Sequence, residues 1–65
     1  MILKEKITLF CIRNSLRKKD LAAKIGVTPN TMYYWEVGRK INRKNADLLI
    51  EATDGYITEK DLRIE

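Results

Sequence analysis

The chain has 65 residues, 34% of them charged, and a formal net charge of +4 at pH 7. One cysteine and no histidine exclude an internal disulfide and any metal site built from thiolates or imidazoles. No apolar run approaches the roughly 20 residues of a membrane span, and charged residues interrupt the only stretch that could serve as a signal peptide. We therefore expect one small domain, residues 1–65, located in the cytoplasm.

Apolar residues near the N-terminus follow a helical period. Leu3, Ile7 and either Phe10 or Cys11 recur at steps of three to four residues, which predicts an amphipathic helix over residues 3–13. We expect the single cysteine to be a buried apolar side chain of this helix rather than a reactive thiol.

The stretch 21–38 fits two short helices that meet at a sharp turn. Leu21 and Ile25 lie four residues apart and share one helix face, so they predict a helix over residues 17–25. Gly26 should end this helix, because the positive φ that turns the chain costs glycine almost nothing.

Thr28 and Pro29 mark the start of the second helix of the pair. The threonine side chain can cap free N–H groups, and proline is tolerated at the first helical position because its missing donor is not needed there. Met32 and Trp35 lie three residues apart and define the side that faces the core. The second helix is expected over residues 29–37.

The sequence RKNADLLIEAT favours a further helix over residues 43–53, with the Asn42 side chain as its N-terminal cap. The side chains expected on its buried side are those of Ala46, Leu49 and either Ala52 or Thr53. After an Asp-Gly pair, Thr58 is followed three residues later by an acid, which resembles a capping box. Residues 58–62 should therefore form one last helical turn.

The Asp54-Gly55 pair is also a strong hairpin signal, because LLIEA before it and YIT after it are plausible strands. The alternative fold is therefore α+β, with a C-terminal hairpin over residues 48–62 that could pair edge to edge with a second chain. We favour the helix, because the LLI run lacks the strict alternation of a half-buried strand. The predicted fold class is all-α, a compact bundle of four to five helices.

Residues 16–38 closely resemble the helix-turn-helix of the lambda-repressor-like superfamily, which includes Cro and related phage regulators. The tail IEATDGYITEKDLR is similar to that of small Cro-like and YdaS-type regulators, and GRKI at residues 38–41 also occurs in a Cro protein with a β-structured C-terminal part. The resemblance implies a helical bundle that binds operator DNA, usually as a dimer, in the bacterial cytoplasm or nucleoid. One departure is that Arg17 and Lys18 replace the family's usual Ser or Thr followed by Gln.

Helical phase selects the residues that would read DNA bases. At about 100° per residue, Asn30, Tyr34 and Val37 point most directly away from the core, and Tyr33 lies beside them. Asparagine can pair with adenine through two hydrogen bonds, and a tyrosine ring can pack on a thymine methyl group. The residues expected to read bases or line the groove are Asn30, Tyr34, Tyr33, Pro29 and Thr31.

Charge is divided unevenly along the chain. Residues 1–44 carry eleven Lys or Arg and three acids, a net of +8, whereas residues 45–65 carry two and six, a net of −4. Basic residues therefore flank the expected reading helix at both ends, as in proteins that clamp two phosphate backbones beside a groove. The residues expected to contact phosphate are Arg17, Lys18, Thr28, Arg39, Lys40, Arg43 and Lys44.

These patterns predict a sequence-specific DNA-binding transcriptional regulator, a Cro-like phage or prophage repressor whose partner is double-stranded operator DNA, with no cofactor and no small-molecule substrate. A homodimer, at least on DNA, is expected because one module buries only about 600 to 1,000 Å². An enzyme is not expected, because the chain has no nucleophile–base pair and no glycine-rich phosphate loop. The alternative is a protein-interaction module, such as an antitoxin-like partner that docks through its acidic tail.

Overall fold

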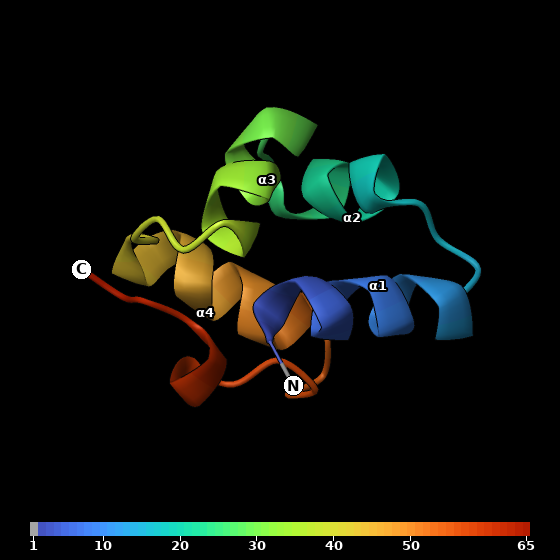
Figure 1. The fold of residues 1–65 in the computed structure, drawn as a ribbon. Coiled ribbons are helices and arrows are strands. Elements are labelled where there is room, and N and C mark those ends of the chain that lie inside the picture. Colours follow the sequence, from blue (N-terminus) through green and yellow to red (C-terminus); the bar gives the residue numbers. More distant parts are fainter. Residues whose placement is uncertain (1) are drawn as a thin grey trace.

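The computed structural model describes residues 2–65, and within these residues four α-helices and one 3-10 helix follow one another without a strand (Figure 1). The helices are α1 (Leu3–Arg13), α2 (Lys18–Ile25), α3 (Pro29–Glu36), α4 (Arg43–Ala52) and the 3-10 helix η1 (Glu59–Asp61). The predicted all-α fold class is confirmed, since the described chain is a small bundle of four helices.

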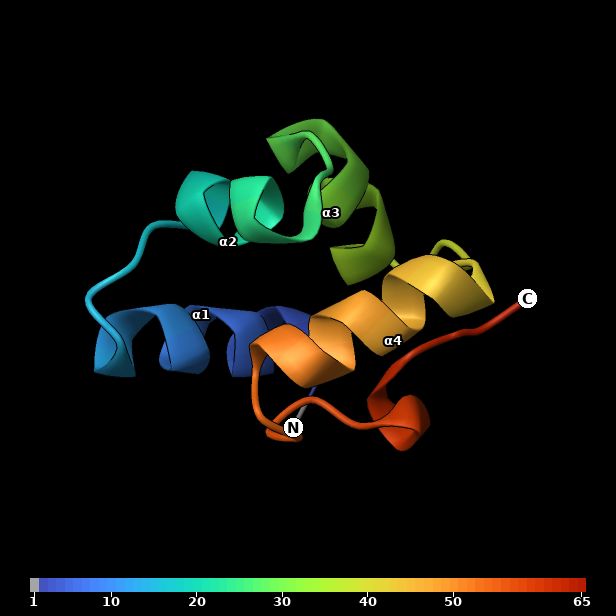
Figure 2. The same cartoon turned by 180° about the vertical axis from the view of Figure 1, so that it is seen from behind.

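Helix α2 is the central helix of the bundle, because it packs against α1, α3 and α4. In Figure 1, α1 and α4 form the lower part of the molecule and α2 lies above α1. Helix α3 stands at the end of α2, with its first turn at the upper edge of the molecule in both Figure 1 and Figure 2. The N-terminal end of α3 is therefore the part of this helix farthest from α1 and α4.

Every α-helix contributes to one hydrophobic core. The buried apolar side chains are Ile7, Cys11, Leu21, Ala22, Ile25, Met32, Trp35, Ile41, Ala46, Leu49, Ile57 and Leu62. The predicted bounds of α1 are confirmed, and Cys11 rather than Phe10 takes the fully buried position. The longest helix, α1, has 11 residues, and no helix within residues 2–65 is long and apolar enough to cross a bilayer.

The turn between α2 and α3 forms as its residues predict. Gly26 has φ +81° and ends α2 in the left-handed conformation. The Thr28 Oγ1 atom accepts a hydrogen bond of 3.2 Å from the Thr31 N–H, and Pro29 is the first residue of α3. Helix α3 ends one residue earlier than predicted, because Val37 has the cap geometry.

The start of α2 lacks a hydroxyl cap, as the sequence indicates, but it has a substitute. Arg17 takes the extended cap conformation, so α2 begins one residue later than predicted. The Arg17 N–H donates a hydrogen bond of 3.0 Å to the Asp20 Oδ2 atom. This bond is the largest cause of a lowered pKa for the Asp20 carboxyl. The Asp20 carboxylate in the first turn therefore stabilises the N-terminus of α2 where a hydroxyl cap is missing.

The hairpin alternative for residues 48–62 is wrong. Helix α4 starts at the predicted cap, where the Asn42 Oδ1 atom accepts from the Asn45 N–H at 2.8 Å. After α4, Asp54 and Gly55 have φ values of +51° and +79° and reverse the chain. Positive φ at both residues also suits a hairpin turn, but here it ends a helix.

A buried hydroxyl group secures the reversal after α4. The Thr53 Oγ1 atom donates to the Leu49 carbonyl at 3.0 Å and accepts from the Ile57 N–H at 3.2 Å. Thr53, not Ala52, is therefore the buried residue at this position, and Ile57 is fully buried beside it. The predicted last helical turn is present as η1, which is shorter than expected.

Two contacts attach the C-terminal segment to the bundle. The Lys6 Nζ atom lies 2.9 Å from the Asp61 Oδ2 atom and ties η1 to α1. The Ile41 N–H donates to the Arg63 carbonyl at 2.8 Å, and the Glu65 N–H donates to the Ile41 carbonyl at 2.9 Å, which forms an isolated parallel bridge. These hydrogen bonds fix residues 63–65 against Ile41, in the segment that connects α3 to α4.

Candidate nucleic-acid interface

The outer face of α3 carries the side chains that the sequence selected for reading bases. Asn30 is exposed, and 55% of Tyr33 and 47% of Tyr34 are accessible to solvent. On the opposite side of the helix, Met32 and Trp35 are buried in the core. The predicted helical phase is therefore confirmed, and a polar amide and two phenol rings face outward together.

The first turn of α3 presents a more compact surface. The hydroxyl oxygens of Thr28 and Thr31 lie 3.0 Å apart and share a hydrogen bond, and the Thr28 oxygen also caps the helix. Thr31 is half-buried, whereas Thr28 and Pro29 are exposed. These residues can contact a ligand at the N-terminus of α3, but the hydroxyl groups of both threonines already have a hydrogen-bond partner within the protein.

A cation lies beside the outward-facing rings. The guanidinium carbon of Arg39 lies 5.0 Å from the centroid of the Tyr34 ring, within the range of a cation–π contact. The Tyr33 and Tyr34 rings are 6.1 Å apart and tilted by 54°. Val37, which is also exposed, extends this surface toward the end of α3. The surface combines aromatic and apolar groups with a positive charge.

Three further predicted phosphate contacts have charges that face solvent. The Arg17 side chain is largely exposed, and its Nε atom makes only a 3.5 Å contact with Asp20. Lys40 and Lys44 are exposed, and neither takes part in an ion pair within residues 2–65. Lys40 and Lys44 can therefore approach an anion without breaking an ion pair within residues 2–65, and Arg17 would give up one long, exposed contact.

Two other predicted phosphate contacts are engaged with carboxylates. The Lys18 Nζ atom lies 2.8 Å from the Glu36 Oε2 atom, and the Glu36 side chain is only 4% exposed. The Arg43 Nη1 atom lies 2.7 Å from Glu59 and 3.4 Å from Asp47, and these hydrogen bonds, first to Glu59, raise the pKa of the Arg43 guanidinium. Of the six basic residues among the predicted phosphate contacts, Lys18 and Arg43 therefore do not have their charges free.

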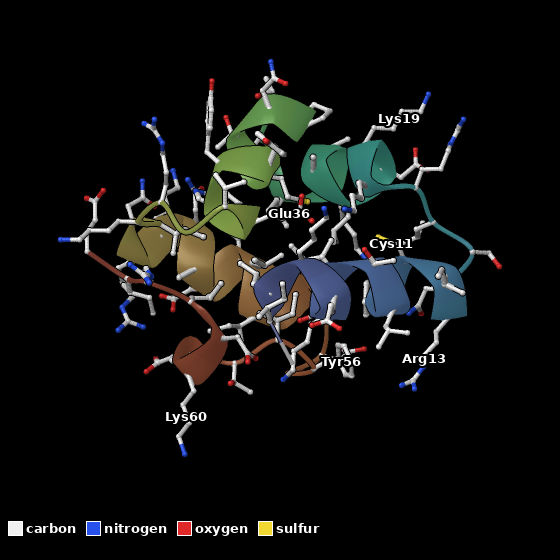
Figure 3. All side chains as sticks on the ribbon, in the orientation of Figure 1. Cys11, Arg13, Lys19, Glu36, Tyr56 and Lys60 are labelled. Atoms are coloured by element: carbon white, nitrogen blue, oxygen red, sulfur yellow. The ribbon has the colours of Figure 1, made fainter. Side chains whose placement is uncertain are left out.

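Two further charged residues of this region are not among the predicted site residues. Lys19 extends outward from α2 in Figure 3, one residue after Lys18. Glu36 lies at the C-terminal end of α3, where the helix dipole disfavours an acid. That unfavourable position was the one available signal that Glu36 has a partner, since its distance from Lys18 in the sequence gives none.

No protein-family model matches the chain, and no curated protein and no solved structure matches it. The arrangement of the chain's own side chains is therefore what indicates its function. Their arrangement combines one helix with an exposed polar and aromatic face, and exposed basic side chains at the start of α2, after α3 and at the start of α4. A surface of this composition is suited to a groove with negatively charged walls.

Proposed function

We propose that this protein is a sequence-specific regulator that binds double-stranded DNA, with α2, the turn and α3 acting as a helix-turn-helix. The observation that carries the proposal is the division of α3 into a buried side and an exposed side with Asn30, Tyr33 and Tyr34. A helix about 10 to 12 Å wide fits the major groove, which is about 12 Å wide. The first turn of α3 projects from the bundle, so it enters the groove first (Figure 2).

The exposed basic side chains support the same placement. Arg39 and Lys40 follow α3, and Arg17 and Lys19 lie at the start of α2. With α3 in the groove, these two groups approach backbones on either side of it, and each neutralised phosphate releases counterions. Lys44 in the first turn of α4 adds a further exposed cation. The base contacts then specify the sequence, while the phosphate contacts position the protein.

We propose that two copies bind one operator. A single module of this size buries too little DNA surface for both high affinity and high specificity, and two half-sites one helical turn apart raise both. A dimer seated on a promoter in this way blocks polymerase, which makes repression the regulatory outcome. No cofactor is required by this proposal.

The test is selection of bound sequences from a random DNA pool at near-physiological salt. We expect recovery of inverted half-sites with centres about 10 base pairs apart. The matched control is the Asn30→Ala, Tyr34→Ala double variant, which keeps every buried side chain and should enrich no such pairs. If the unchanged protein enriches no sequence, the proposal is wrong. A stable complex with another protein that survives high salt would then favour the antitoxin-like alternative.

A further inference from the structure

We propose that Lys18 is a positioning residue that holds the reading face of α3 through its ion pair with Glu36, and that it does not contact phosphate. The inference rests on the proposed function and reassigns a residue that the sequence pattern places among the phosphate contacts. Two observations motivate it: the 2.8 Å distance between Lys18 Nζ and Glu36 Oε2, and the nearly complete burial of the Glu36 side chain.

The ion pair and the connecting turn join opposite ends of the two helices. Residues 26–28 link the end of α2 to the start of α3, whereas Lys18 is the first residue of α2 and Glu36 is the last residue of α3. Each helix has 8 residues and is about 12 Å long, so the turn alone leaves the far end of α3 to be held by apolar packing. The ion pair adds a second link there, within one helical turn of Tyr33 and Tyr34.

The surroundings of Glu36 require a positive partner. A nearly buried carboxylate without a partner is costly, and within residues 2–65 no buried side-chain nitrogen or oxygen lacks a hydrogen bond. Burial raises the pKa of the Cys11 thiol, while the positive charge of Lys18 lowers it and the negative charge of Glu36 raises it. In Figure 3, Glu36 and Cys11 lie between α1 and the pair formed by α2 and α3. If Lys18 turned toward a phosphate, it would leave this carboxylate unpaired.

The neighbouring lysine provides a matched control. Lys19 has the same charge, is exposed and points outward from the same helix turn in Figure 3. It takes part in no ion pair within residues 2–65. Removing the charge of Lys19 therefore tests an electrostatic contribution from this helix end without disturbing the ion pair.

The first measurement uses the free protein. We compare amide hydrogen exchange over residues 33–37 in Lys18→Gln, Glu36→Gln, the double variant and Lys19→Gln. We expect the two single variants to speed exchange by about five- to tenfold, the double variant by no more than either single one, and Lys19→Gln not at all. Unchanged exchange in Lys18→Gln would overturn the proposal, whether or not the protein binds DNA.

The second measurement compares binding to the selected operator and to random duplex DNA over a range of salt concentrations. Lys18→Gln should reduce the ratio of the two affinities about tenfold and leave the logarithmic salt slope unchanged. A slope that falls by about 0.9 per subunit with an unchanged ratio would identify Lys18 as a phosphate contact and overturn the proposal. If the unchanged protein binds no DNA, the proposed function fails, while the exchange measurement still tests the ion pair.

The exchanged pair, Lys18→Glu with Glu36→Lys, supplies a rescue experiment. This variant keeps the net charge and places each charge at the helix end whose dipole favours it. We expect exchange over residues 33–37 and the affinity ratio to return to within about twofold of the unchanged protein. Slow exchange together with an affinity ratio that stays about tenfold low would overturn the proposal, because the restored ion pair would then not restore the reading face.

Discussion

Asn30 is the residue whose side chain is best suited to distinguish one base pair from another. Its amide carries both a donor and an acceptor, so it can bond adenine at two atoms at once, whereas a lysine can only supply charge and donors. It lies in the first turn of α3, on the exposed side, and its side chain takes no part in the helix cap. Lys40, beyond the end of α3, is exposed and has a charge suited to phosphate.

These two residues should therefore respond differently to truncation. Asn30→Ala should relax sequence preference at one or two base positions, at a cost of about 1 to 3 kcal/mol for the preferred base. Lys40→Ala should weaken binding by a similar factor on every sequence. Competition binding against operators with single base changes measures both effects. The opposite pattern would mean that the reading face is wrongly assigned.

The sequence predicted those features of the structure that depend on residues close together in the chain. The Thr28 and Asn42 caps and the buried Trp35 each follow from residues within four positions, and the structure confirms all three. The Lys18 partner and the closer of the two Arg43 partners could not be predicted in this way. Glu36 lies eighteen residues from Lys18 and Glu59 lies sixteen residues from Arg43, so these pairs depend on how whole helices are oriented.

At the scale of elements, the tail illustrates why a local signal can leave two structures open. Asp54 and Gly55 both adopt positive φ, and this conformation serves a hairpin turn and a helix end equally well. The outcome depends on packing, since Thr53 and Ile57 become buried and share a hydrogen bond only in the helical arrangement. The bridge at Ile41 has no local signal at all and was not predicted.

The attachment of η1 to α1 should be sensitive to pH. Burial raises the pKa of the Asp61 carboxyl, but hydrogen bonds from Lys6 and Thr58 outweigh this effect and leave the pKa below its ordinary value of 3.8. The Asp61 carboxylate also lies 2.9 Å from the Thr58 backbone nitrogen. Because the folded-state pKa is lowered, these bonds stabilise the protein above about pH 4, and the stabilisation is lost as pH falls through the folded-state pKa.

Asp61→Asn should therefore lower the free energy of unfolding by about 1 to 2 kcal/mol near neutral pH. The gap between this variant and the unchanged protein should narrow steadily below about pH 4. Urea unfolding midpoints at several pH values measure the gap. Asp54→Asn is the control, because Asp54 is exposed and asparagine tolerates its positive φ. A gap that stays constant down to acid pH would contradict the assigned ion pair.

At the scale of the whole molecule, the basic residues of the first 44 positions and the acids of the last 21 are only partly separated in space. Arg43 comes from the basic part of the sequence, but acids from the C-terminal part neutralise it. Lys6 is likewise paired with Asp61. The net charge of +8 over residues 1–44 therefore overstates the charge available to DNA. The relevant number is the count of exposed cations near α3 that carboxylates leave unpaired or only weakly paired.

The number of these free cations sets how steeply the affinity for DNA falls with salt, so the salt dependence of binding tests the whole proposed interface. The exposed cations that the proposed interface brings toward phosphate are Arg17, Lys19, Arg39, Lys40 and Lys44. At about 0.9 per neutralised phosphate, they predict a logarithmic salt slope of about −4.5 per subunit and about −9 for a dimer on a full operator. The slope is measured from affinities between about 0.05 and 0.2 M salt, over which a dimer should lose roughly five powers of ten.

Lys40, which follows α3, and Lys60 in η1 separate an effect of this interface from a general effect of positive charge. Lys40→Gln should reduce the magnitude of the slope by about 0.9 per subunit, because it removes one phosphate contact. Lys60 extends from η1 at the lower edge, away from α3, so Lys60→Gln should leave the slope unchanged although it alters net charge equally (Figure 3). Equal effects of the two changes would mean that DNA is attracted without a preferred face. A slope near zero would contradict DNA binding through phosphates altogether, since no arrangement of these cations beside a duplex avoids counterion release.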